Sequence, residues 1–93
     1  MSYKEDRQAL AEVTHKLVQR VGLMERRAPM TLEARDAYRH CWYLHERAKE
    51  HLQDALLDGD IPLEEAQAKL LESWRNLNAN LQEVLKVLER DVP

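Results

Sequence analysis

The chain has 93 residues, of which 44% are hydrophobic and 33% charged, and it contains two glycines and no phenylalanine. A chain of this length forms one domain with a thin core, and its composition is typical of long helices and differs from that of a disordered segment. The net charge is −3, and nowhere do 18 uncharged apolar residues follow one another, so we expect no membrane span and no secretory leader.

The first element is predicted to be a helix over about residues 3–25. Ser2 and Glu5 have the spacing of a capping box, in which a serine hydroxyl and a glutamate carboxylate bind amide donors at the helix start. Pro29 prevents the helix from continuing unbroken. Apolar residues recur at three- and four-residue intervals and predict one buried stripe, made of Leu10, Val13, Leu17, Val21 and Met24.

The second helix is predicted over about residues 31–57, with Thr31 as its N-cap and Gly59 suited to the left-handed conformation that ends helices. Its predicted inward stripe is rich in alanine, which allows close approach of a neighbouring backbone. The stripe consists of Ala34, Ala37, Tyr38, Cys41, Leu44, His45, Ala48, Leu52, Ala55 and Leu56.

The third helix is predicted over about residues 62–90, with Pro62 in its first turn, where a missing amide hydrogen is tolerated. The predicted stripe contains Leu63, Ala66, Leu70, Trp74, Leu77, Leu81, Val84 and Leu88. The short connection between the second and third helices forces an antiparallel hairpin. The sequence therefore predicts a single domain over 1–93, an all-α elongated three-helix bundle in which a shorter first helix packs along the hairpin.

Two groups of residues are candidates for metal binding. Cys41 and His45 stand four apart and share one helical face, but a zinc site needs four ligands, so this pair would have to be completed by Tyr38, a carboxylate or a second copy of the helix. Residues 54–65 resemble a degenerate calcium loop, with Asp54, Gly59 and Glu65 at the first, sixth and twelfth positions. A helical hairpin explains the same residues without calcium, so we expect no cofactor.

Aromatic and leucine residues on the outer side of the second helix indicate a protein-binding surface. Trp42 lies at the edge of the inward stripe and Tyr43 points almost opposite to it, and exposed tyrosine and tryptophan are enriched in interfaces. Leu32 and Leu57 lie on the same outer side. We predict that these four residues bind a protein partner or a second copy of the chain.

Charge is unevenly distributed along the chain. Residues 1–30 carry six basic and four acidic side chains, whereas residues 58–93 carry four basic and eight acidic ones. The acidic third helix would repel nucleic acid, and the basic first helix of one copy could face the acidic third helix of another. The single cysteine suits a reducing compartment, and we expect a cytoplasmic location.

The sequence thus favours a small non-catalytic helical interaction module, an adaptor, regulator or assembly subunit, that self-associates as a homodimer or larger species. Two alternatives stay open. One is a metal-binding helical protein, and the other is a small dimeric all-α enzyme whose shared cavity would be lined by Arg20, Arg35 and Arg39. The second rests on analogy of fold alone, because no Gly-rich phosphate loop is present and the only serines are Ser2 and Ser73.

Overall fold

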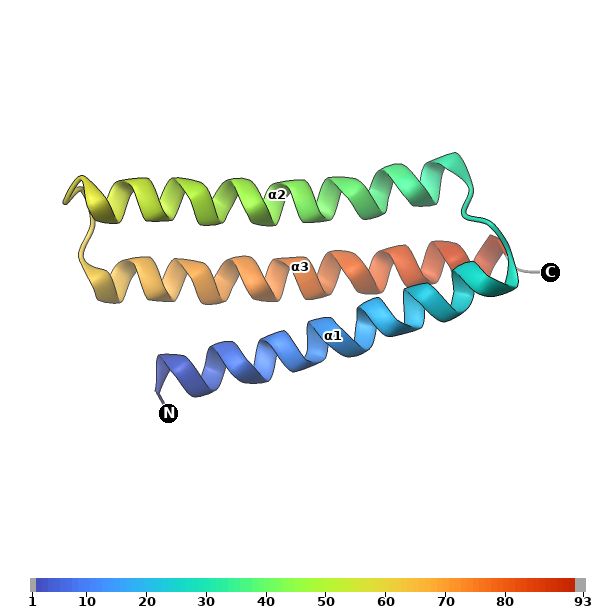
Figure 1. Ribbon diagram of the computed structural model, residues 1–93, viewed down its shortest axis with the longest axis horizontal. Coiled ribbons are helices and arrows are strands. Elements are labelled where there is room, and N and C mark those ends of the chain that lie inside the picture. The colour runs from blue at the N-terminus through green and yellow to red at the C-terminus, as the bar shows by residue number, and fades with distance from the viewer. Residues whose placement is uncertain (1, 92–93) are drawn as a thin grey trace.

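The computed structural model describes residues 2–91, and in this part of the chain the regular structure consists of three α-helices and no strand. Helix α1 spans Tyr3–Arg27, α2 spans Leu32–Leu57 and α3 spans Leu63–Asp91. The prediction of an all-α three-helix bundle is confirmed, and the predicted helix ends agree within two residues (Figure 1). The bundle is elongated, with extents of 51 × 26 × 15 Å.

Local sequence signals set the helix starts. The Ser2 hydroxyl accepts a hydrogen bond from the amide of Glu5 at 3.2 Å, and the Thr31 hydroxyl accepts one from the amide of Ala34 at 3.2 Å. Both contacts satisfy amide donors of a first turn, which have no carbonyl partner within the helix. Both predicted N-caps are therefore confirmed.

The turn between α2 and α3 is a Schellman motif. Gly59 has φ +76°, its amide donates to the carbonyl of Leu56, and the amide of Asp60 donates to the carbonyl of Ala55 at 2.9 Å. A residue with a Cβ is strained at this φ, which explains why glycine follows the helix here. The motif ends α2 sharply enough for α3 to return along it within five residues.

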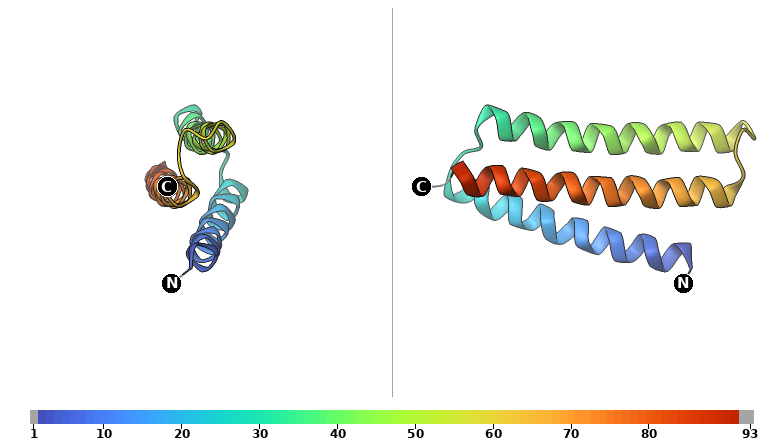
Figure 2. Two further views of the ribbon diagram at one scale, coloured as in Figure 1. Left: turned by 90° about the vertical axis from the view of Figure 1, so that its left-hand side faces the viewer. Right: turned by 180° about the vertical axis from the view of Figure 1, so that it is seen from behind.

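Helix α3 is the centre of the bundle. Both α1 and α2 pack along α3, but they make no close backbone contact with each other, and the end-on view shows them on different sides of it (Figure 2). A single apolar cluster nevertheless joins the three helices. Its buried members are Leu17, Val21, Ala34, Cys41, Leu77, Leu81, Val84, Leu85 and Leu88.

Polar side chains fix how α1 sits on α3. Thr14 and Asn78 are both buried, the Thr14 hydroxyl donates to Oδ1 of Asn78, and Nδ2 of Asn78 donates to the Leu10 carbonyl at 3.2 Å. A buried polar pair is satisfied only in one alignment of the two helices, so it specifies their register. At the surface, Arg20 of α1 pairs with Glu89 of α3 at 3.4 Å.

Some predicted core positions are wrong. Val13 is 43% exposed, and the neighbouring Thr14 takes the buried position in its place. Leu44, Leu56 and Leu63 are also exposed, the last because it begins α3 where little packs against it. The period of the apolar residues predicts the centre of a buried stripe better than its edges, because burial at the edges depends on which helix packs there.

Candidate functional site

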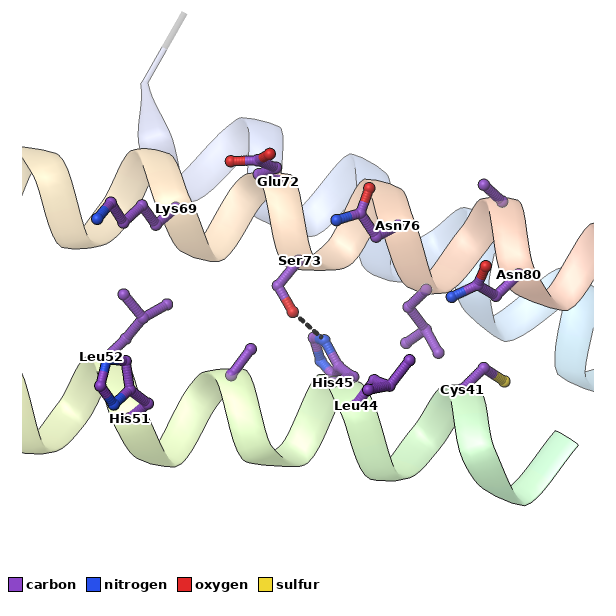
Figure 3. Close-up of a pocket in the computed structure, with 13 residues that line it drawn as sticks. Cys41, Leu44, His45, His51, Leu52, Lys69, Glu72, Ser73, Asn76 and Asn80 are labelled. Atoms are coloured by element: carbon purple, nitrogen blue, oxygen red, sulfur yellow. Dashed lines mark hydrogen bonds between the residues drawn. The ribbon is translucent and has the colours of Figure 1, made fainter. Parts of the chain in front are cut away.

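A groove with a volume of about 550 Å³ lies between α2 and α3 (Figure 3). Helix α2 contributes Cys41, Leu44 and His45, and α3 contributes Asn76 and Asn80. A smaller hollow of about 270 Å³ shares three of these residues, Cys41, Leu44 and Asn80, and extends the groove toward Ala37 and Val87. We call this continuous surface the α2–α3 groove.

The groove lies on the side of the hairpin that α1 leaves open. No α1 residue lines either hollow, whereas Asn78 faces α1. Asn76 precedes Asn78 by two residues, which places it about 160° away around the helix at ~100° per residue. The hairpin is thus covered by a helix on one side only.

The centre of the groove wall is a polar contact between the two helices. Nδ1 of His45 lies 2.8 Å from the Ser73 hydroxyl, and His45 also packs edge-to-face against Trp74, with ring centroids 4.5 Å apart. His45 is only 3% exposed, so burial lowers the pKa of its imidazole, and Lys49 lowers it further while Glu46 raises it. The imidazole is therefore neutral near pH 7.

A serine beside a histidine raises the question of nucleophilic catalysis. Such a base is normally oriented by a third group on its other nitrogen, and Nε2 of His45 has no hydrogen-bond partner among the described protein atoms. The Ser73–His45 contact instead links the two helices and fixes their register, in the same way as the Thr14–Asn78 contact links α1 to α3.

The predicted metal pair lies together in the groove wall but is engaged in other contacts. Cys41 is buried, burial raises the pKa of its thiol, and its Sγ donates to the Tyr38 carbonyl at 3.0 Å. A zinc ligand is a thiolate, so a raised thiol pKa disfavours this role. Within residues 2–91 no three side chains of His, Cys, Asp or Glu are grouped to hold a metal ion.

The residues of the predicted calcium loop belong mostly to helices. Asp54 lies inside α2, where its carbonyl accepts from the Asp58 amide, and Glu65 lies inside α3, where it pairs with Lys69 at 3.5 Å. The turn between them is accounted for by the Schellman motif around Gly59. The three arginines of the enzyme alternative are exposed, and none of them lines the α2–α3 groove.

The four predicted partner-binding residues do not form one patch. Leu32 and Leu57 are 73% and 85% exposed, but they stand at opposite ends of α2, about 37 Å apart at ~1.5 Å per residue. Trp42 is half-buried against the core and touches the rings of Tyr38 and His45, whereas Tyr43 is exposed and stacks on His40. Neither aromatic residue lines the groove.

The groove residues that the sequence did not single out are mostly polar side chains of α3. Ser73, Asn76 and Asn80 are ordinary surface residues by pattern, and only the alignment of α3 on α2 reveals that they share a hollow with Leu44. The one groove residue that the sequence pattern did mark is Leu44. The pattern placed it on the inward stripe of the second helix, and the structure leaves it 46% exposed in the groove.

Comparison of the chain with protein-family models, with curated proteins and with solved structures finds no match. None of the helices in residues 2–91 combines the length and the apolar character that crossing a membrane requires. The case for a function therefore rests on the geometry of the chain itself.

Proposed function

We propose that this chain is a small non-catalytic protein–protein interaction module, an adaptor, regulator or assembly subunit, that binds through the α2–α3 groove and self-associates there. The proposal rests on the observation that α1 covers only one side of the hairpin formed by α2 and α3. Helix α1 packs on one side of α3, and the other side presents a groove long enough for another helix.

The chemistry of the groove suits a helical occupant. Small side chains at Ala37 and Ala48 leave room for a backbone to approach, Leu44 offers apolar surface, and Asn76 and Asn80 provide amide donors and acceptors. Helices of a four-helix bundle pack in this way around a shared core. For a chain with a thin core, pairing across subunits also enlarges the apolar volume removed from water.

Two neighbouring residues provide a matched test. Leu44 is 46% exposed and lines the groove, whereas Tyr43 is 58% exposed and points away from it. Sedimentation velocity from about 1 to 100 µM, a range that spans typical transient affinities, should show a dimer or larger species for the wild type and for Tyr43→Glu. Leu44→Glu should sediment as a folded monomer, because a buried unpaired carboxylate is strongly disfavoured.

Circular dichroism of each variant verifies that the helices are retained. If Tyr43→Glu dissociates the assembly and Leu44→Glu does not, the surface predicted from Trp42 and Tyr43 is the binding surface and the groove is not. A wild-type chain that stays monomeric across the whole range contradicts self-association. The free, buried Cys41 is compatible with the proposed cytoplasmic location.

A further inference from the structure

The apolar core is concentrated at one end of the bundle. Its buried members lie in the second half of α1, the first half of α2 and the second half of α3, and these segments meet at the end opposite the α2–α3 turn (Figure 1). We call residues 46–72, the part of the hairpin around the turn, the hairpin tip. The structure describes this whole range, and Ala66 is the only buried residue in it. Much less buried apolar surface therefore holds the tip than the core end.

The packing of the tip is also incomplete. Its inward-facing leucines line a hollow of about 180 Å³, to which Tyr3 of α1 contributes as well. These leucines are Leu52, Leu56, Leu63 and Leu70. Protein interiors are normally close-packed, and a segment with few buried apolar contacts opens at a lower free energy than the rest of a fold. The tip is therefore the segment of the hairpin that opens most easily.

No polar contact joins α2 to α3 within the tip. Among residues 46–72, the hydrogen bonds and ion pairs between side chains stay inside one helix, as in Lys69 with Glu65. The two helices are joined instead by His45 and Ser73 at the border of the tip, and by an ion pair at the far end of the hairpin. His45 is also the last buried residue of α2 before the turn. The tip is thus closed at its border by the His45–Ser73 contact.

The His45 side chain fits this border only as the neutral imidazole. Its ring centroid lies 4.5 Å from that of Trp74, and its Nε2 is buried without a hydrogen-bond partner among the described protein atoms. An imidazolium donates from both nitrogens, so its Nε2 would be a buried charged donor without an acceptor, which is strongly disfavoured. Separation of α2 from α3 at this point exposes the ring to water, where it can take up the proton.

The neighbouring charged groups do not compensate for this burial. Burial has the largest effect and lowers the pKa of His45, Lys49 of the same helix lowers it further, and Glu46 raises it. Helix α1 makes no close backbone contact with α2 and contributes no residue to the α2–α3 groove. The titratable side chains that line this groove with His45 are Cys41, His51, Lys69 and Glu72.

We propose that the hairpin tip is an acid-sensitive switch, in which protonation of His45 releases α2 from α3 between the turn and the His45–Ser73 contact while the core end stays folded. The released residues 46–57 are too few for a stable helix, because isolated helices in water need roughly 12 to 15 residues or more. Opening also removes part of the groove wall, since Ala48, His51 and Leu52 belong to the tip. This inference goes beyond the proposed function, because it concerns a change within one chain.

Hydrogen exchange followed by mass spectrometry at pH 7.5, 6.5 and 5.5 tests the switch, with each rate corrected for the intrinsic pH dependence of exchange. Amides of residues 50–57 report on the tip, and amides of residues 81–88 report on the core end. Histidines titrate in this pH range, whereas aspartate and glutamate stay largely ionised. An open state that takes up one proton with a pKa near 6.5 becomes about 10-fold more populated, relative to the closed state, between pH 7.5 and 5.5.

The protection factors of residues 50–57 should therefore be lower than those of residues 81–88 at pH 7.5, and they should fall about 10-fold further by pH 5.5. His45→Phe fills the same space beside Trp74 but does not titrate, so its tip protection should not change with pH. His51→Gln is the matched control, because His51 is an exposed histidine within the tip itself. This control should keep the wild-type fall.

Three results would overturn the switch. If residues 50–57 are less protected than residues 81–88 but their protection does not change with pH, the tip frays from the turn without moving His45. If the two sets are equally protected at every pH, the tip opens only when the whole fold unfolds. A fall that persists in His45→Phe, or that disappears in His51→Gln, assigns the proton to another group. Exchange within one chain needs no partner, so these outcomes are separate from the sedimentation test of the proposed function.

Discussion

His45 makes the stability of the fold depend on pH in a defined direction. Burial lowers the pKa of its imidazole in the folded chain below the value near 6.5 that the unfolded chain has. Below about pH 6.5 the unfolded chain binds a proton that the folded chain does not, so acid favours unfolding. The contribution of His45 is thus fully present above about pH 6.5 and is lost as the pH falls toward the folded-state pKa.

The magnitude follows from linkage. One proton taken up by the unfolded chain alone changes the free energy of unfolding by up to about 1.4 kcal/mol per pH unit. At pH 5.5, one unit below the unfolded pKa, the loss is therefore up to about 1.4 kcal/mol, relative to a total stability on the order of 5 to 10 kcal/mol for a domain of this size.

Urea unfolding at pH 5.5, 6.5 and 7.5 measures this effect when His45→Phe is compared with the wild type at equal chain concentration. The phenylalanine fills the same space beside Trp74 but does not titrate. The difference in unfolding free energy between the two chains should shift by up to about 1.4 kcal/mol in favour of His45→Phe on going from pH 7.5 to 5.5.

His51→Gln is the matched control, because His51 is an exposed histidine of the same helix. A difference between His45→Phe and wild type that stays constant across this pH range would refute the reasoning. A control variant with the same pH dependence as His45→Phe would refute it as well, because the effect would then not come from burial.

Two other positions carry stability predictions that urea unfolding can check. Asn78→Ala leaves the buried Thr14 hydroxyl without its side-chain partner and should lower the free energy of unfolding by about 1 to 3 kcal/mol. The apolar double variant Thr14→Val/Asn78→Leu should lose less stability than the sum of the losses of its two single variants. If the losses simply add, the two side chains are not coupled. Gly59→Ala places a residue with a Cβ in the left-handed region at φ +76° and should lower the free energy of unfolding by about 1 to 2 kcal/mol. Gly22 lies inside α1, where an added Cβ meets no atom within 4 Å, so Gly22→Ala should raise the free energy of unfolding by about 0.5 to 1 kcal/mol. An equal change in stability at both glycines would contradict this account of the turn.

Local signals predicted most of the fold. Ser2, Thr31 and Gly59 act on the backbone within a few residues of themselves, so their roles could be derived without knowing the tertiary structure. The short turn likewise determined the antiparallel hairpin. The number, order and approximate ends of the helices follow from such signals and from the period of the apolar residues.

The arrangement around α3 could not be predicted in the same way. An apolar stripe shows that a face is buried but not which neighbour buries it, and the burial of Asn78 makes sense only once Thr14 stands opposite. The groove is likewise a property of two aligned helices, since Leu44 and Asn76 are far apart in sequence. The residues predicted for partner binding were chosen from one helix alone, and the structure leaves Leu32, Tyr43 and Leu57 exposed but packs Trp42 partly against the core.

The central place of α3 has a consequence for how sequence change is tolerated. Both α1 and α2 pack on α3 and make no close backbone contact with each other. A substitution on either outer helix therefore perturbs one packing surface, whereas a substitution at the buried Leu77 or Leu81 of α3 perturbs the packing of both outer helices. Saturation mutagenesis should therefore find the fewest acceptable amino acids at positions of α3 and more at positions of α1 and α2. In this molecule the last third of the polypeptide is the scaffold on which the first two thirds pack.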